Sequence, residues 1–578
     1  MKFLRALFVA ACLPCMLHAI ALDREAFTFT NYDLSIQIEP AQQRLAARGK
    51  ITLRNDSAVP QKIAVLQISS SLNWRAIKID GDGVQFVTQP YASDIDHTGS
   101  LSEAVITLPQ PVAPKSSIEL EIAYEGIIQR DATRLTRIGT PEDDANSSDW
   151  DEIATTFTGV RGAGHVVWYP VATEVVNFSE DSSLFEVLGR WKAREAGAKM
   201  DISLSFPVIS GEEKAPTILC DGMGMEMVIK GGSPQWPVAK CSYQTLSTSS
   251  PTFLSAQYQL LDRHDVSVYY LPGHDVDAAN FADAAEKAEP LIYEWFGKAN
   301  QKARSADLPN RDAVPFESGS LLLVPLAGID PKLAGLSASH QLTHAAISSF
   351  RPWINEGLAH FAQALYLEQE KGRRAALDYM GLHRAAFEDV EHTGSAPRSE
   401  DEVNHSLVST TNDELYRSKA MFVWWMLRDM VGDASLKKAI ASYRSEDDKE
   451  PSYMQRLIQA QTQRDLEWFF DDWVYRDRGL PDFKIESAYP HKTMTDAYVV
   501  TVTVDNLGTA SAEVPVIIKF SGGEKTKRLE VRAKAKASIR IEVPAAPSEV
   551  AVNDGSVPEV QLKNNVLKIT PEANADSK

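Results

Sequence analysis

Hydrophobic and polar residues alternate in two long parts of the chain, and a helical spacing replaces the alternation between them. From about residue 26 to residue 264 the alternation is clear at 32–38, 49–55 and 118–124. Half-buried strands show this period of two, and clusters of Asn, Asp, Gly and Pro separate the segments here. We therefore expect a β-sandwich or β-saddle in this part, and no regular alternation of strands with helices.

The pattern becomes helical near residue 275. Apolar residues recur at helical spacing over 278–295, where Ala and Leu are enriched. The apolar stretch 321–326 is a candidate for a buried strand. Further helices are expected as far as about residue 476, including 416–430 and 436–443.

Two helices in this middle part are separated by a short break at 348–352. The first contains His340, and the second is expected over 353–371. Pro352 suits the start of a helix, because proline is tolerated in the first turn and not in the interior. The break is short, so we expect the two helices to be antiparallel neighbours.

The alternation returns after about residue 484. Strands are predicted at 498–504 and 514–520, with a turn at Gly522-Gly523. About ninety residues of this kind fit a small β-sandwich of immunoglobulin-like size. The sequence thus predicts a multidomain α+β protein, divided into a signal peptide (1–21), an N-terminal β domain (22–264), a mainly helical domain (265–480) and a C-terminal β-sandwich (481–578).

The first residues have the features of an export signal. Lys2 and Arg5 precede an apolar run at 7–17, which is too short to span a bilayer. Residues 19–21 read Ala-Ile-Ala and offer a cleavage site, so a mature chain beginning near Leu22 is expected. We predict an exported protein, either periplasmic or secreted, with no transmembrane segment in the mature chain.

The net charge restricts the possible binding partners, and the cysteine content restricts the possible disulfides. The 578 residues carry a net charge of −19, which argues against nucleic acid or an anionic membrane as a partner. Two of the four cysteines, Cys220 and Cys241, lie outside the signal segment and flank a Gly/Pro-rich stretch at 231–234. A disulfide is the favoured interpretation in an oxidising compartment, ahead of two free thiols or zinc ligation.

The strongest chemical signal is a histidine pair with a later glutamate. His340 and His344 are spaced i and i+4, so both imidazoles lie on one face of a helix and can reach one metal ion. Glu356 on the following helix could complete a two-His, one-Glu zinc site that leaves a fourth position open for water. Gln341 occupies the position that a catalytic Glu holds in the His-Glu-x-x-His motif, and an amide cannot take a proton from that water.

These residues resemble a known family. The segments 342–344 and 351–361 look like the catalytic core of the aminopeptidase N family of gluzincin zinc metallopeptidases, and 416–420 resembles that family's later Tyr element. The resemblance implies a thermolysin-like helical domain with zinc bound by His340, His344 and Glu356. It also implies that Tyr416 donates a hydrogen bond to the oxyanion and that Gln341 stands at the position of the general base.

Three departures from the family pattern shape the expected function. Gln341 replaces the base, and such a loss typically costs about 10²–10⁴-fold in rate. The spacer of eleven residues between His344 and Glu356 is shorter than is usual in the family. A Gly-x-Met-Glu-Asn element is missing ahead of the histidine helix, where the corresponding strand begins at Glu317, a candidate substitute base.

The leading hypothesis is an exported zinc metallopeptidase-like protein that acts on peptides or proteins, with impaired or altered activity. One alternative is an inactive pseudopeptidase that binds zinc and peptides. Another is a β-rich scaffold or chaperone module that binds no metal.

Overall fold

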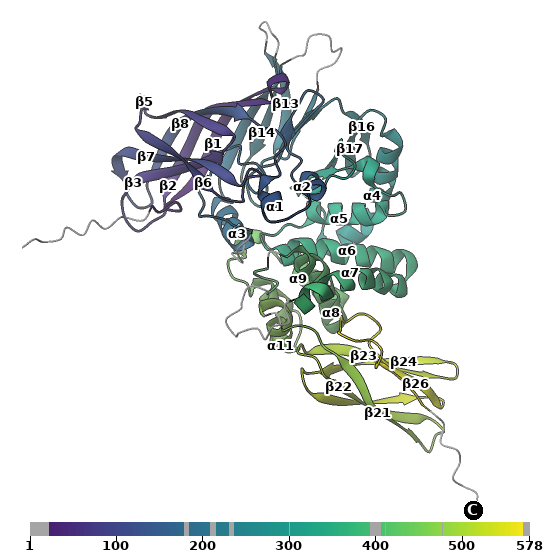
Figure 1. Ribbon diagram of the computed structural model, residues 1–578. Coiled ribbons are helices and arrows are strands. Elements are labelled where there is room, and N and C mark those ends of the chain that lie inside the picture. Colours follow the sequence, from purple (N-terminus) through teal and green to yellow (C-terminus); the bar gives the residue numbers. More distant parts are fainter. Residues whose placement is uncertain are drawn as a thin grey trace, which may run out of the picture.

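Two β-rich regions flank a mainly helical middle region, and the three follow one another in chain order (Figure 1). The structure is a computed structural model and describes residues 22–569, apart from 179–183, 208–215, 231–235, 300, 394–405, 411 and 477. The predicted signal peptide and the predicted turn at 231–234 lie outside the described residues. The expected multidomain architecture of sheets and helices is confirmed at this level.

The N-terminal region contains an eight-stranded sheet (β13-β14-β11-β1-β2-β8-β4-β5), a four-stranded sheet (β12-β15-β10-β9) and a three-stranded sheet (β3-β7-β6). Leu34, Ile36 and Ile38 are buried on one face of β1, as their alternation predicts. The strands are β1 (Phe27–Glu39), β2 (Arg44–Asn55), β3 (Gln61–Ser69), β4 (Leu72–Ile79), β5 (Asp82–Gly83), β6 (Phe86–Ala92), β7 (Ser100–Val112), β8 (Ser117–Ile127), β9 (Glu152–Ile153), β10 (Phe157–Val160), β11 (Lys199–Ser205), β12 (Thr217–Cys220), β13 (Met223–Lys230), β14 (Trp236–Tyr243) and β15 (Phe253–Ala256).

Short helices interrupt this β region, which the alternating pattern did not predict. They are α1 (Thr133–Arg137), α2 (Glu142–Ser148) and α3 (Leu184–Glu195), with a 3₁₀ turn η1 (Pro40–Gln42). Three acidic residues in the first turn of α2 complement its dipole, a signal that was available in the sequence. The disulfide expected between Cys220 and Cys241 is present and joins β12 to β14, and thereby the four-stranded sheet to the eight-stranded one.

The middle region combines a five-stranded sheet with a bundle of helices, and it carries the predicted site residues. Its strand order is β16-β17-β18-β20-β19, so β19 is an edge strand. The elements are β16 (Gln259–Asp262), β17 (Val266–Tyr270), β18 (Ala303–Asp307), β19 (Phe316–Ser318), β20 (Leu321–Val324), η2 (Leu326–Gly328), α4 (Asp275–Phe296), α5 (Ala334–Ala346), α6 (Pro352–Lys371), α7 (Arg373–Thr393), the π-helical turn η4 (Leu415–Lys419), α8 (Ala420–Val431), α9 (Asp433–Ala441), η5 (Ser445–Asp447), α10 (Tyr453–Gln459), α11 (Glu467–Phe470) and the π-helical turn η6 (Asp471–Tyr475).

Close packing of α6 against α8 holds the centre of this region together. The rings of Trp353 and Trp424 stack with centroids 5.1 Å apart, and Trp424 Nε1 donates to the carbonyl of Trp353 at 3.0 Å. A Cβ at Gly357 would lie 2.8 Å from Ala420 Cβ, so only glycine allows the two helices to approach this closely. The close approach fixes the position of Glu356, the residue before this glycine.

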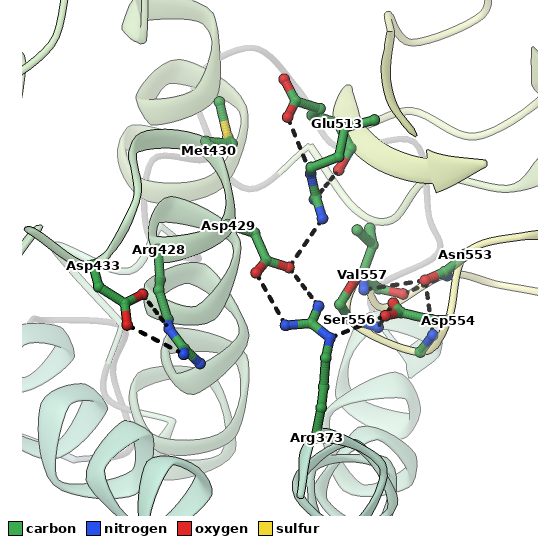
Figure 2. A network of polar contacts seen from close by, with 12 residues as sticks. Arg373, Arg428, Asp429, Met430, Asp433, Glu513, Asn553, Asp554, Ser556 and Val557 are labelled. Carbon is green, nitrogen blue, oxygen red and sulfur yellow. Dashed lines mark hydrogen bonds and ion pairs between the residues drawn. The ribbon is translucent and has the colours of Figure 1, made fainter. Parts of the chain in front are cut away.

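The C-terminal region forms two antiparallel sheets, β21-β22-β25 and β24-β23-β26-β27. Its strands are β21 (Phe483–Lys492), β22 (Tyr498–Asn506), β23 (Ala512–Phe520), β24 (Gly523–Val531), β25 (Lys536–Val543), β26 (Pro547–Val552) and β27 (Val566–Lys568). A network of arginines and carboxylates connects it to α7 and α8 (Figure 2). Within the described residues, no helix has both the length and the apolar character needed to cross a membrane.

Candidate metal centre

Helix α5 presents the two predicted histidines on one face, as their spacing requires. His340 Nε2 and His344 Nε2 lie 3.2 Å apart. His344 is buried, and His340 is half-buried. Burial, together with the charges of His344 and Arg417, keeps the pKa of His340 well below its usual value, so this imidazole is neutral and can act as a ligand.

Helix α6 runs antiparallel to α5 and brings Glu356 to the histidines. Glu356 contacts His344 near the end of α5, whereas Gln363, two turns later in α6, donates to the carbonyl of Leu336 near the start of α5. The predicted pairing of the two helices is thus confirmed. Glu356 Oε2 lies 3.7 Å from His340 Nε2, and Glu356 Oε1 lies 3.5 Å from His344 Nε2.

These three donors have a spacing that suits a tetrahedral zinc ion. Zinc ligands at about 2.0–2.1 Å in tetrahedral geometry are separated from one another by about 3.4 Å. The measured separations of 3.2, 3.5 and 3.7 Å lie close to that value. Burial opposes the ionisation of Glu356, but the charges of His344 and Arg417 hold its pKa below the ordinary value, so it is a carboxylate. The imidazoles of His340 and His344 and the carboxylate of Glu356 are therefore ligands of the kind, and at the spacing, that a zinc ion takes.

Neighbouring side chains fix the orientation of the two imidazoles. The amide nitrogen of Asn355 lies 3.1 Å from His344 Nδ1, and Asn355 Oδ1 accepts from the backbone N–H of Ser349 at 3.1 Å. The ring of His360 meets the ring of His340 edge-on at 5.0 Å. Both contacts restrain the histidine rings. The Asn355 nitrogen is itself a donor, so it differs from the acceptor that usually takes the outer N–H of a metal-bound histidine.

Gln341 points to a second acidic residue beside the site. Its Nε2 donates to Glu317 Oε1 at 2.6 Å, whereas its buried Oε1 accepts no hydrogen bond within the part of the chain that the structure describes. Glu317, His340 and His344 each offer a ligand atom within 4.8 Å of the other two. Burial raises the pKa of Glu317, and the neighbouring charge of Glu356 raises it further. Gln341 therefore links the histidine helix to Glu317.

The N-terminal region holds the edge strand that carries Glu317. Because side chains alternate across a strand, Phe316 and Ser318 face away from Glu317. Ser318 Oγ donates to the Asp221 carboxylate and accepts from the N–H of Ser250 at 2.9 Å. The ring of His165 meets the ring of Phe316 at 5.0 Å. Contacts from another part of the chain thus position the strand next to the candidate metal centre.

Tyr416 and Arg417 lie on the π-helical turn η4, which packs against α6. Burial raises the pKa of Tyr416, and the negative charge of Glu356 contributes to the rise, so the phenol keeps its proton. Arg417 Nε lies 3.7 Å from Glu356 Oε2. A π-turn inserts an extra residue into a helix and is often found at functional sites. Here it places a phenol and a guanidinium next to each other beside the candidate metal centre.

A second group of possible metal ligands, Asp149, Asp151 and His165, lies in the N-terminal region. Arg134 pairs with Asp149 at 2.6 Å, and Arg161 pairs with Asp151 at 2.6 Å, with all four side chains almost fully buried. The two positive charges already balance the two carboxylates, so a divalent cation would leave the buried cluster with excess positive charge. We therefore assign a structural role to this group.

The structure brings together His340, His344, Glu356 and Gln341, and it places Tyr416 on a turn packed against the helix of Glu356. Glu317, which the sequence suggested only as a candidate base, proves to be the hydrogen-bond partner of Gln341. Sequence reasoning missed Asn355 and Arg417, although each adjoins a residue that it had singled out. Neither has a spacing that marks it as a site residue.

No known protein-family model matches the sequence, and a search of curated proteins finds no match. Solved structures with the same fold do exist. Aminopeptidase A of Legionella pneumophila, solved in complex with aspartic acid, matches with a TM-score of 0.63 and 12% identity over 92% of this chain and 59% of that one. The M1 zinc metallopeptidase of Deinococcus radiodurans matches with a TM-score of 0.50 and 14% identity, over 75% of this chain and 91% of that one.

A glutamate-to-alanine variant of the Deinococcus enzyme matches with a TM-score of 0.53 and 15% identity, over 79% of this chain and 96% of that one. At these identities the likeness concerns the fold. The chain therefore has the fold of M1 zinc metallopeptidases, in agreement with the fold that the sequence resemblance implied.

Proposed function

We propose that this protein is a zinc-binding, peptidase-like protein that hydrolyses peptide bonds slowly, because Gln341 stands in place of the general base. The observation that carries the proposal is the set of three separations among His340, His344 and Glu356, which suits a tetrahedral zinc ion. The likeness in fold to M1 zinc metallopeptidases supports it as well.

The residues around the site have separate chemical roles in this proposal. Bound zinc would supply a Lewis acid that polarises a peptide carbonyl and acidifies water. Tyr416 would donate a hydrogen bond to the carbonyl oxygen as that oxygen gains negative charge. Gln341 can accept a hydrogen bond from the attacking water through its unused Oε1 but cannot take the proton. Glu317, bonded to Gln341, is the candidate acceptor of that proton.

A second candidate function is the binding of zinc and peptides without hydrolysis. The observation that favours it is the hydrogen bond from Gln341 to Glu317, which engages one carboxylate oxygen of the candidate base. The two functions share the metal ligands and the fold. They differ in whether wild-type protein cleaves peptides in a way that depends on the metal.

The deciding experiment measures zinc content and peptide hydrolysis in the wild type and in Gln341→Glu. We expect about one zinc per chain in both proteins, and we expect the variant to be faster by about 10²–10⁴-fold, the usual contribution of a general base. Gln369→Glu is the matched control, because it adds the same charge to an exposed position of α6. It should leave the rate unchanged.

Zinc with chelator-sensitive wild-type hydrolysis would support slow catalysis, and loss of this activity in Tyr416→Phe would exclude the non-hydrolytic alternative. Zinc without wild-type hydrolysis, but with activity in Gln341→Glu, would favour that alternative. A His340→Ala variant that retains all of its zinc would contradict both functions, because the metal would then be bound elsewhere. A wild-type protein that binds no zinc would also contradict both and would leave the scaffold hypothesis.

Export also belongs to the proposal. The basic residues Lys2 and Arg5, the apolar run after them and the Ala-Ile-Ala sequence at 19–21 support it. The Cys220–Cys241 disulfide is of the kind that forms in oxidising compartments. The mass of the N-terminal peptide of protein isolated from its natural host would test it, with a start near Leu22 as the expected result.

A further inference from the structure

Arg417 places a positive charge beside the proposed zinc ligands. Its Nε lies 3.7 Å from Glu356 Oε2, which is beyond hydrogen-bond distance. Arg417 follows Tyr416 on the π-helical turn η4, which packs against the helix that carries Glu356. The guanidinium therefore lies within the group of residues that would surround a bound peptide, and not on a separate surface.

Most of the donors of this guanidinium have no hydrogen-bond partner within the described part of the chain. An arginine has five N–H donors. Arg417 makes one hydrogen bond among the described residues, from Nη1 to Asp413 Oδ2 at 3.2 Å, and its Nε has no hydrogen-bond partner there. Asp413 is 56% exposed, so this pair contributes little. The Arg417 side chain is 39% exposed but its Nε is buried, so a ligand that enters the site reaches the side chain through its other atoms.

With zinc bound, the charge balance at the site favours a negative ligand, because the ion and Arg417 would carry three positive charges against the two carboxylates of Glu356 and Glu317. Gln341 is uncharged at a position where the related motif has a glutamate, and Arg417 adds a positive charge nearby. A bound zinc ion would neutralise the negative charge of Glu356, so this carboxylate would balance less of the positive charge of Arg417. A planar guanidinium with free N–H groups matches a carboxylate, which it can bind through two parallel hydrogen bonds.

We propose that Arg417 binds a carboxylate of the peptide, so that the site selects peptides with a carboxylate close to the bond that faces the metal. This inference rests on the proposed function, because it names the substrate class of the same site. The carboxylate has two sources in peptides, the free C-terminus and the side chain of Asp or Glu. The chemistry that Arg417 recognises is the same for both.

The test compares peptides that differ only in this group, bound to the full-length zinc-loaded protein. The probes are Ala-Ala-Ala with a free C-terminus, the same peptide as its C-terminal amide, and the amides of Ala-Asp-Ala and Ala-Asn-Ala. Affinities come from calorimetric titration, and kcat/KM replaces Kd for any peptide that is cleaved. Zinc content is measured in the same samples.

We expect at least one carboxylate peptide to bind about tenfold or more tightly than its neutral partner, as for other hydrogen bonds to charged groups. Arg417→Ala should abolish this preference, and Arg417→Lys should keep part of it, because a single ammonium replaces the two-pronged contact. Arg374→Ala is the matched control. Arg374 also pairs with an aspartate one helical turn away, Asp378, at 2.9 Å, and the control should keep the full preference.

The outcomes separate the inference from the function on which it rests. A preference for the free C-terminus alone, or for the Asp side chain alone, supports the inference and identifies the source of the carboxylate. Zinc-loaded wild type that binds acid and neutral peptides equally would overturn the inference and leave the function intact. A preference that persists in Arg417→Ala would also overturn it. Absence of both zinc and peptide binding would contradict the function itself.

Discussion

The middle region contacts its N-terminal neighbour through a buried, hydrogen-bonded carboxylate and its C-terminal neighbour through partly exposed ion pairs. On the N-terminal side, Asp221 is nearly fully buried and accepts hydrogen bonds from the hydroxyls of Tyr243 and Ser318 and from the N–H of Thr252. On the C-terminal side, Asp429 pairs with Arg373 at 2.7 Å and with Arg528 at 3.0 Å, and these side chains are between 12% and 37% exposed (Figure 2).

The two interfaces also differ in their distance from the candidate metal centre. Asp221 binds Ser318, which is the residue next to Glu317, so the N-terminal interface reaches the site through one strand. Asp429 follows Tyr416 by thirteen residues along a helical segment, or roughly 20 Å at 1.5 Å per residue. We infer that the N-terminal contact shapes the site as well as the fold, whereas the C-terminal contact serves stability alone.

The largest expected effect comes from Asp221→Ala. The change would leave the Tyr243 hydroxyl and the Thr252 N–H without their acceptor, whereas Ser318 Oγ keeps the carbonyl of Ser250 at 2.9 Å. Each unsatisfied group costs about 1–3 kcal/mol. We expect a loss of about 3 kcal/mol or more in the free energy of unfolding, measured with urea, together with weaker peptide binding by the zinc-loaded protein. Unchanged peptide affinity in a destabilised but folded variant would show that this interface does not position Glu317.

The pH dependence of stability provides a second, somewhat smaller effect at the same residue. Burial raises the pKa of Asp221 to about 6, although its three donors act against the rise. The unfolded carboxyl has a pKa of about 4, so between these values the folded protein holds a proton that the unfolded chain releases. The free energy of unfolding should therefore fall as the pH rises from about 4 to about 6, by roughly 2–3 kcal/mol from this group.

Asp221→Asn cannot ionise and should lack this part of the pH dependence. The measurement is urea unfolding of both proteins across that range, and the informative quantity is the difference between the two curves. Parallel curves would mean that Asp221 is as easily ionised in the fold as in the unfolded chain. Water would then reach the Asp221 carboxylate and its hydrogen-bond donors more freely than the burial of Asp221 indicates.

Local features of the fold were predictable from the sequence, whereas contacts between distant segments were not. The alternation at Leu34, Ile36 and Ile38 and the i,i+4 spacing of His340 and His344 are short-range patterns that one strand or helix fixes by itself. Ser318 meets Asp221 across 97 residues, and Gln341 meets Glu317 across 24 residues. Such contacts depend on how sheets and helices pack, and no local period encodes them.

Glu356 and Arg417 show the same difference between local patterns and distant contacts within the site itself. Glu356 was a candidate ligand because it lies on the helix after the histidines. The family resemblance was needed to favour this role, because a glutamate at the start of a helix has an ordinary explanation in the helix dipole. Arg417 was not singled out, since an ideal helix would not indicate that it adjoins Glu356. Arg417 lies on the π-turn η4, and the spacing of residues 415–419 does not predict that turn.

The smallest expected effect is at the C-terminal interface, through Asp429→Ala. The change would leave Arg373 and Arg528 without a shared carboxylate, but Arg373 keeps Asp554 at 3.3 Å and Arg528 keeps Glu513 at 3.0 Å. Because water also reaches these side chains, we expect a loss of only about 1–2 kcal/mol in the free energy of unfolding. Added salt should reduce the difference from the wild type, since partly exposed ion pairs are screened.

Zinc content and peptide affinity should stay at wild-type values in Asp429→Ala, in contrast to Asp221→Ala. This contrast tests the comparison directly, because both variants remove one carboxylate that bridges the middle region to a neighbour. Equal losses of peptide affinity in the two variants would show that the helical region responds as one unit. A loss confined to Asp221→Ala would place the control of the site on strand β19.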